Sequence, residues 1–159
     1  MKKTLSIILI VILLITPFSF TTHAEIPEII ISETTEYFED GSSITTTITQ
    51  QISSLSPRAT KTVSGSKVKT GKNSDGDILY KFKVNGTFSV NVGVSATCTA
   101  VSCGASDLAS GWSLDSSTTS KSGNTARATG ILKYKVLLIT TQTIEIPLTL
   151  SCDANGTLS

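Results

Sequence analysis

The feature that most limits the fold of this chain is an alternation of apolar and polar side chains between residues 78 and 98. Ten apolar residues occupy even positions, and only Leu79 departs from this pattern: Ile78, Tyr80, Phe82, Val84, Phe88, Val90, Val92, Val94, Ala96 and Cys98. Side chains that alternate in this way line one face of a β-strand, whereas a helix would spread them around its axis. Similar patterns recur along the chain and no segment has a convincing helical stripe, so we predict an all-β fold.

The parity of these residues also predicts where the chain turns. A two-residue hairpin turn at Asn85-Gly86 would place hydroxyl groups against the apolar face, so we expect the strand to continue through it. A three-residue turn at 91–93 keeps the apolar residues on one face and supplies a Gly for the left-handed position. We therefore predict one long strand from 78 to 90 and a return strand from 94 to about 100.

The rest of the chain alternates in stretches that are separated by turn residues. In addition to the two strands above, we predict strands at 29–38, 43–52, 60–70, 112–120, 125–136 and 143–152, and a loop at 101–111. Pro147 lacks a backbone donor, so its strand should lie at a sheet edge or contain a bulge. About eight short strands favour an antiparallel β-sandwich, Ig-like or similar, over a barrel.

The first 24 residues are typical of a secretory signal peptide. Lys2 and Lys3 precede the apolar run Ile7–Ile15, and Thr22-His23-Ala24 ends the segment. A membrane-spanning helix is the alternative, but the apolar run is much shorter than the roughly 20 residues that a bilayer requires. We therefore expect cleavage of residues 1–24, release from the cell and no stable membrane anchor.

After cleavage the chain would begin near Glu25 and form one domain over residues 25–159. Within this domain we distinguish an N-terminal β-hairpin with its linker, at 25–57, from a sandwich body at 58–159. The linker-like part is the stretch Ser53-Ser54-Leu55-Ser56-Pro57.

Cleavage would also exclude several classes of functional site from the exported chain. The only His is His23, so the exported chain would lack the imidazole that Ser-His-Asp and Cys-His catalysis and His-ligated zinc require. Its charge would be 13 − 2 = 11 basic residues against 12 acidic residues, which argues against a nucleic-acid ligand. We expect no enzyme activity, no catalytic residue, no cofactor and no metal.

Two local patterns imitate functional sites. Residues 71–78 match part of a calcium loop but lack its first and last acidic ligands, so a plain hairpin turn is favoured. Asp107, Trp112 and Asp115 could be two carboxylates beside a sugar-stacking ring, yet the sequence does not set the carboxyl separation that a glycosidase needs. We favour a core Trp with two Asp residues that stabilise turns.

Three cysteines in an exported chain predict one disulfide bridge and one remaining thiol. Cys98 and Cys152 are in phase with apolar residues of different strands, so both should point into the sandwich, whereas Cys103 lies in the predicted loop. We favour a Cys98–Cys152 bridge with Cys103 free. Bridges from Cys98 or Cys152 to Cys103 are the alternatives.

One apolar run, at 136–139, occurs where a connection between strands is expected. It either closes one end of the sandwich or forms an exposed patch that contacts a partner or lipid. Together with the single Trp, the last three residues of the run form the candidate ligand or partner surface: Trp112, Leu137, Leu138 and Ile139.

Four segments allow a comparison with a known group of proteins: 34–42, 112–114, 121–126 and 148–156. They resemble small Ser/Thr-rich secreted proteins of Gram-positive bacteria, which implies a bacterial source and a β-rich fold and transfers no site residue. The sequence thus favours a secreted, non-enzymatic β-sandwich that binds an extracellular protein or glycan. A secreted toxin or bacteriocin-like membrane-active protein is the alternative, because strand 43–52 resembles the amphipathic strands of β-pore formers.

Overall fold

The computed structural model describes residues 27–51, 60–137 and 139–159, and these residues form eight β-strands. The strands are β1 (Glu28–Tyr37), β2 (Ser43–Gln51), β3 (Thr60–Lys72), β4 (Ile78–Asn91), β5 (Ser95–Ser106), β6 (Trp112–Ser122), β7 (Thr125–Val136) and β8 (Ile139–Ser151). The expected signal peptide, the linker at 53–57 and Leu138 lie outside the described residues. The prediction of an all-β fold with about eight strands is confirmed.

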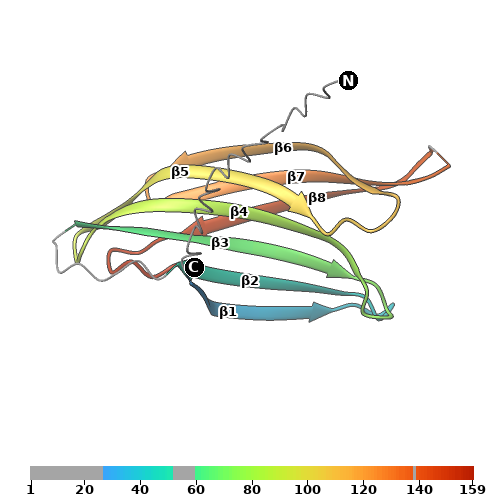
Figure 1. Ribbon diagram of the computed structural model, residues 1–159, viewed down its shortest axis with the longest axis horizontal. Coiled ribbons are helices and arrows are strands. Elements are labelled where there is room, and N and C mark those ends of the chain that lie inside the picture. The colour runs from blue at the N-terminus through green and yellow to red at the C-terminus, as the bar shows by residue number, and fades with distance from the viewer. Residues whose placement is uncertain (1–26, 52–59, 138) are drawn as a thin grey trace, which may run out of the picture.

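The strands form two antiparallel sheets that pack face to face (Figure 1). One sheet has the order β1-β2-β3-β4-β5, and the other has the order β6-β7-β8. Neighbours in each sheet are also neighbours in the sequence, so each sheet is a meander of antiparallel strands. The N-terminal hairpin of β1 and β2 pairs with β3 and thereby continues the larger sheet. The predicted antiparallel sandwich is confirmed.

The core lies between the larger sheet, chiefly β4, and the smaller sheet. β4 presents even-numbered residues inward, and Phe82, Val84, Phe88 and Val90 have no exposed surface. The ring of Phe82 reaches the smaller sheet at Gly130, where an added Cβ would lie only 2.5 Å from the ring. The alternation in the sequence therefore marks the core-facing side of this strand, as predicted.

The return strand differs from the prediction in its length. β4 runs through Asn85-Gly86 without turning, as expected, but β5 pairs with it as far as Ser106. The predicted loop at 101–111 is therefore wrong up to that residue. Backbone N–H and C=O groups along the edge of β4 need partners, and a strand of small side chains can supply them as well as a strand of large ones.

A bulge in β5 reverses which of its side chains face the core. Thr99 is an extra residue between the pairs that Thr87 and Phe88 of β4 make with β5. One additional residue changes the parity of a strand, and beyond the bulge odd-numbered residues pack against the core: Val101, Cys103 and Ala105. Cys103, expected in a loop, therefore lies half-buried in a strand.

β8 is an edge strand of the smaller sheet, as Pro147 predicted. At one end of this edge the last residues of the chain add a short pairing, in which Ser151 and Ser159 exchange two backbone hydrogen bonds of 2.9 Å. Leu158 is buried there beside Gly65 of β3. The chain end thus fills the space between the sheets at the end of the sandwich opposite the β1–β2 and β3–β4 turns (Figure 1).

Candidate functional site: an aromatic cleft at one end of the sandwich

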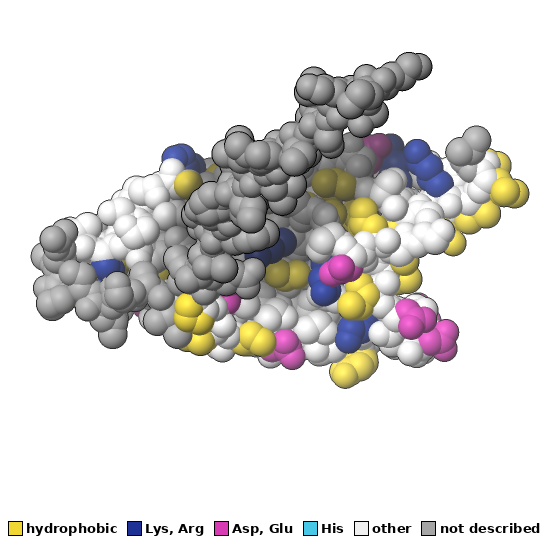
Figure 2. All heavy atoms as spheres, in the orientation of Figure 1, with side chains coloured by type: hydrophobic (Ala, Val, Ile, Leu, Met, Phe, Trp, Pro, Cys, Tyr) yellow, Lys and Arg dark blue, Asp and Glu magenta, His cyan; other side chains and the backbone are white. Residues whose placement is uncertain are grey.

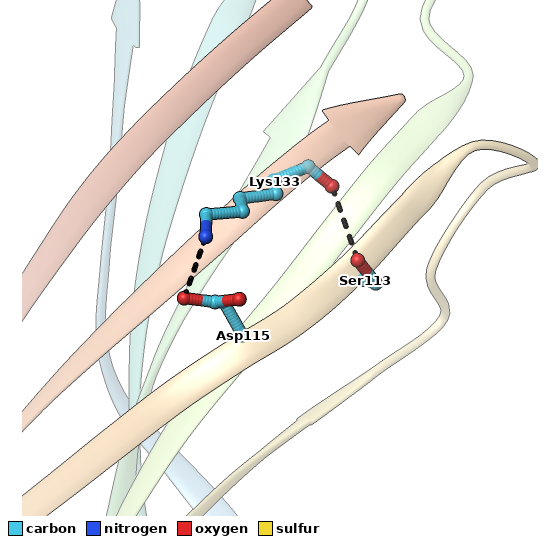
Figure 3. Close-up of polar contacts among 3 residues, drawn as sticks. All are labelled: Ser113, Asp115 and Lys133. Carbon is cyan, nitrogen blue, oxygen red and sulfur yellow. Dashed lines mark hydrogen bonds and ion pairs between the residues drawn. The ribbon is translucent and has the colours of Figure 1, made fainter. Parts of the chain in front are cut away.

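The two acidic residues considered as catalytic candidates form separate ion pairs. Asp107 lies 2.8 Å from the ammonium group of Lys81, and Asp115 lies 2.9 Å from that of Lys133 (Figure 3). The hydroxyl of Ser113 donates to the carbonyl of Lys133 at 3.4 Å, beside the second pair. Strand alternation places the two lysines on the outer faces of different sheets. The two carboxylates therefore do not face each other across a shared cleft.

A cleft of about 540 Å³ opens at the end of the sandwich that carries the β1–β2 and β3–β4 turns. Its walls come from these turns and from the smaller sheet, at the start of β6 and along β8. Figure 2 shows this end of the molecule as a notch between the β7–β8 hairpin and the region of the β1–β2 and β3–β4 turns, where acidic side chains gather. Its aromatic, amide and carboxylate lining residues are Phe38, Asp40, Asn73, Tyr80, Trp112 and Gln142.

Three aromatic rings are packed in series beside the cleft. The ring centroids of Tyr80 and Trp112 are 5.4 Å apart at an interplanar angle of 51°, and those of Trp112 and Tyr134 are also 5.4 Å apart, at 34°. Such separations are typical of attractive aromatic pairs. Tyr80 is only 7% exposed and burial raises the pKa of its phenol, whereas Trp112 is half-buried. Trp112 is therefore held from both sides and still has surface for a ligand.

Two glycines provide the space that these rings occupy. A Cβ on Gly71 would lie 2.3 Å from the ring of Tyr80, and a Cβ on Gly111 would lie 2.6 Å from the ring of Tyr134. Carbon atoms that are not bonded rest at about 3.5–4.0 Å. Neither position can carry a side chain unless the neighbouring ring moves, so the glycines determine where the rings lie.

Two hairpin turns supply the polar rim of the cleft. Asp40 accepts hydrogen bonds from the hydroxyl and the N–H of Ser42, at 2.6 and 2.9 Å, and these bonds lower the pKa of its carboxyl group. Asn73 accepts bonds from two N–H groups of its own turn at 3.1 and 2.8 Å. The turns touch, because a Cβ on Gly41 would lie 3.1 Å from that of Ser74. The rim is therefore built from two turns that support each other.

The bonds of Asn73 also decide between the two interpretations of residues 71–78. Its side-chain oxygen is used to close the β3–β4 turn, as in an ordinary Asx-type hairpin turn. Within the described ranges, no group of three or more His, Cys, Asp or Glu residues could hold a metal ion. The hairpin-turn prediction is confirmed.

The described residues of the apolar run, Val136, Leu137 and Ile139, lie at the tip of the β7–β8 hairpin, which extends beyond the body of the sandwich (Figure 1). Leu137 is 91% exposed and Ile139 is 68% exposed, so these residues do not close the end of the sandwich. Leu138, between them, lies outside the described residues. Trp112 lines the cleft instead. The predicted surface is therefore two surfaces, a cleft and a hairpin tip, at the same end of the molecule.

The expected Cys98–Cys152 bridge is not formed, and all three cysteines are free thiols. Both residues are buried, as their phase indicated, but the β6–β7 turn lies between their backbones. The N–H of Cys98 donates to the carbonyl of Gly123 at 2.7 Å, and that of Cys152 donates to the carbonyl of Asn124 at 3.0 Å. Burial raises the pKa of the Cys98 thiol, and it raises that of Cys152 to about 11.

Sequence reasoning identified only Trp112 among the residues of the cleft. Tyr80 was predicted as an ordinary core residue, and Phe38 and Asn73 were predicted only as parts of a strand end and a turn. These residues belong to separate segments, so no local motif groups them. One signal was available. Successive strands of a meander run in opposite directions, so the turns after odd-numbered strands lie at the same end of the sandwich.

Comparisons with protein-family models, with characterised proteins and with solved structures find no match to this chain. Its similarity to Ser/Thr-rich secreted proteins therefore stays a prediction. Along the parts of the chain that the structure describes, no helix is long and apolar enough to cross a membrane. The cleft and the hairpin tip are the observations from which a function can be inferred.

Proposed function

We propose that this chain is a secreted, non-enzymatic binding protein and that its end cleft binds a carbohydrate. The observation that carries the proposal is the half-buried Trp112, supported by two tyrosines and facing a rim of amide and carboxylate groups. A sugar ring has apolar faces that pack on aromatic rings and hydroxyl groups that need donors and acceptors. One aromatic platform beside a polar rim meets both needs.

The lining of the cleft includes one acidic and one basic residue, Asp40 and Lys72, besides its amides, so it fits hydroxyl groups better than an ion of either sign. The amide of Gln142 can donate and accept, the Asp40 carboxylate accepts, and Asn73, whose oxygen closes its own turn, keeps an N–H to donate. Phe38, on the turn beside Asp40, is 47% exposed and adds a second aromatic surface to the cleft. The ligand class that uses all of these groups together is a neutral saccharide.

The non-enzymatic part of the proposal rests on the acidic residues. Asp107 and Asp115 are engaged by lysines on different sheets, and among the described residues the lining of the cleft includes a single carboxylate, that of Asp40. Hydrolysis of a glycosidic bond ordinarily uses two carboxyl groups on either side of that bond. Secretion is proposed from residues 1–24, and it would bring the cleft into contact with polysaccharides outside the cell.

The test is a binding screen of the exported protein against bacterial and host polysaccharides, followed by calorimetry on any ligand found. Phe38→Ala should weaken binding roughly fivefold, because one aromatic contact contributes about 1 kcal/mol. Val92→Ala is the matched control, since Val92 is also 47% exposed but lies on the β4–β5 turn at the opposite end. Failure to bind any saccharide, or equal weakening by both variants, would contradict the proposal.

A further inference from the structure

The tip of the β7–β8 hairpin exposes apolar side chains where a soluble turn would ordinarily be polar. Val136 is 45% exposed, in addition to the more exposed Leu137 and Ile139. Figure 2 shows hydrophobic side chains gathered on the hairpin where it projects from the body. Single exposed apolar residues are common on protein surfaces, but several at the apex of one projecting hairpin form a distinct feature.

The backbone of the tip is also unusual for the residues that it carries. Leu137 has φ +49°, in the left-handed region that Gly, Asn and Asp normally occupy in tight hairpins. A Leu at this position gives up both a favourable backbone conformation and the burial of its side chain. Residues that combine two such costs are characteristic of functional sites.

The segment that forms the outer part of the hairpin carries basic residues and no acidic ones. From residue 133 to residue 144 the sequence contains Lys133 and Lys135 and no acidic residue. Lys133 is engaged by Asp115, whereas the exposed Lys135 has no carboxylate within ion-pair distance in the described part of the chain. The apolar residues of the tip therefore follow directly after Lys135, whose ammonium group is not engaged by a carboxylate of the described residues. Tyr134 precedes Lys135 in the sequence.

The two strands of the hairpin pair with each other close to the apex. Lys135 pairs with Thr140, and Val136 pairs with Ile139. The extra residue Thr141 donates its hydroxyl to the carbonyl of Tyr134 at 3.3 Å. Unpaired N–H and C=O groups are costly in an apolar medium, and the groups through which the described parts of β7 and β8 face each other are paired up to the apex.

From these observations we propose that the hairpin tip inserts into the interface of a lipid bilayer that contains anionic headgroups. Leu137 lies two residues beyond Lys135, or roughly 7 Å at the rise of a strand, which matches the depth of about 5–10 Å that interfacial elements reach. Lys135 would then lie among the headgroups. Tyr134 and Trp112 would lie next to the headgroup layer, where Tyr and Trp are common in membrane proteins.

The shape of the tip favours a bilayer over a protein partner. A stable protein interface buries about 800 Å² on each side and requires a broad complementary surface. The narrow apex of one hairpin presents a few side chains on a projection, whereas a bilayer accepts such a projection without a matching surface. Membrane docking of this kind involves the tip alone and does not depend on the carbohydrate cleft.

The experiment measures co-sedimentation with vesicles of phosphatidylcholine alone and of phosphatidylcholine mixed with phosphatidylglycerol. The protein is recovered after export and its intact mass is measured, because an uncleaved apolar leader would itself bind lipid. We expect binding to the mixed vesicles, and we expect Ile139→Ser to weaken it about tenfold. Val94→Ser is the matched control, since Val94 is 72% exposed at the opposite end of the sandwich.

Two further measurements distinguish docking of the tip from purely apolar adsorption and from pore formation. Lys135→Gln should weaken binding to the mixed vesicles, and added salt should remove the difference between this variant and the wild type. Trapped dye should stay inside the vesicles, because a surface contact does not open a pore. Absence of vesicle binding, equal loss in Ile139→Ser and Val94→Ser, or self-association that Leu137→Ser abolishes in the absence of lipid would each overturn the proposal.

Discussion

Replacing Gly71 with Ala should disturb the cleft more than any other change of comparable size in β3. The new Cβ would lie 2.3 Å from Cζ of Tyr80 and 2.7 Å from its hydroxyl oxygen. To restore ordinary contact the ring must move by more than about 1 Å. Its neighbours restrict this movement, because Tyr80 is almost fully buried and packs on Trp112 at a centroid distance of 5.4 Å.

The expected cost follows from the ways in which the structure can respond. A methyl group forced into a packed region costs about 1–3 kcal/mol when neighbouring side chains must leave their positions. For a domain of this size, such a cost lowers the melting temperature by roughly 2–12 °C. The displaced Tyr80 would also shift Trp112, so binding of a saccharide should weaken more than the loss of stability alone would produce.

Gly104→Ala is the control, because Gly104 lies in β5 of the same sheet and a Cβ there has no neighbouring atom within 4 Å. Thermal unfolding followed by circular dichroism should show a clear decrease for Gly71→Ala and almost no change for Gly104→Ala. A second variant combines Gly71→Ala with Tyr80→Leu. Its loss of stability should be smaller than the sum of the losses caused by the two single changes. Equal melting temperatures for the two alanine variants would refute the assigned contact between Gly71 and Tyr80.

Two other predictions concern groups that titrate. In the folded protein at pH 8, iodoacetamide should label Cys103 first, because burial keeps the Cys98 and Cys152 thiols protonated. Mass spectrometry after denaturation should count three free thiols, and a count of one would contradict the structure. Hydrogen bonds from Thr157 and Asn155 lower the pKa of Asp153 below its usual 3.8, so its stabilising effect is present above that pH and is lost as the pH falls. The difference in urea stability between pH 7 and pH 3 should therefore be smaller for Asp153→Asn than for the wild type.

The sequence predicted the parts of the fold that depend on local parity. Alternation along β4 identified the core face and excluded a turn at Asn85-Gly86, since one shifted residue would reverse every side chain of the strand. The same reasoning failed beyond Thr99. A bulge leaves no reliable mark in a stretch of Ser, Thr and Ala residues, so the inward position of Cys103 could not be inferred.

The cleft depends on relations that cross between strands and sheets. Gly71 appears in the sequence as a residue of a turn region, and only the pairing of β3 with β4 shows that it makes room for Tyr80. Likewise, Trp112 could be a core residue or a binding residue until its position between two tyrosine rings is known. The residue type made Trp112 a candidate, and only the arrangement of the strands shows that it lines the cleft.

If the cleft binds a saccharide and the hairpin tip enters a bilayer, as proposed above, the two features together restrict the class of saccharide. Tyr134 connects them, because it packs on Trp112 in the cleft, pairs with Gln142 on the cleft wall and lies two residues before Val136 at the tip. At the rise of a strand, Tyr134 and Leu137 are roughly 10 Å apart. A tip inserted to the depth of its apolar residues would therefore hold the cleft beside the headgroup layer. Two weak contacts with one surface reinforce each other when they can form at the same time. A saccharide anchored to a lipid would therefore use both the cleft and the hairpin tip, whereas a soluble polysaccharide would use only the cleft.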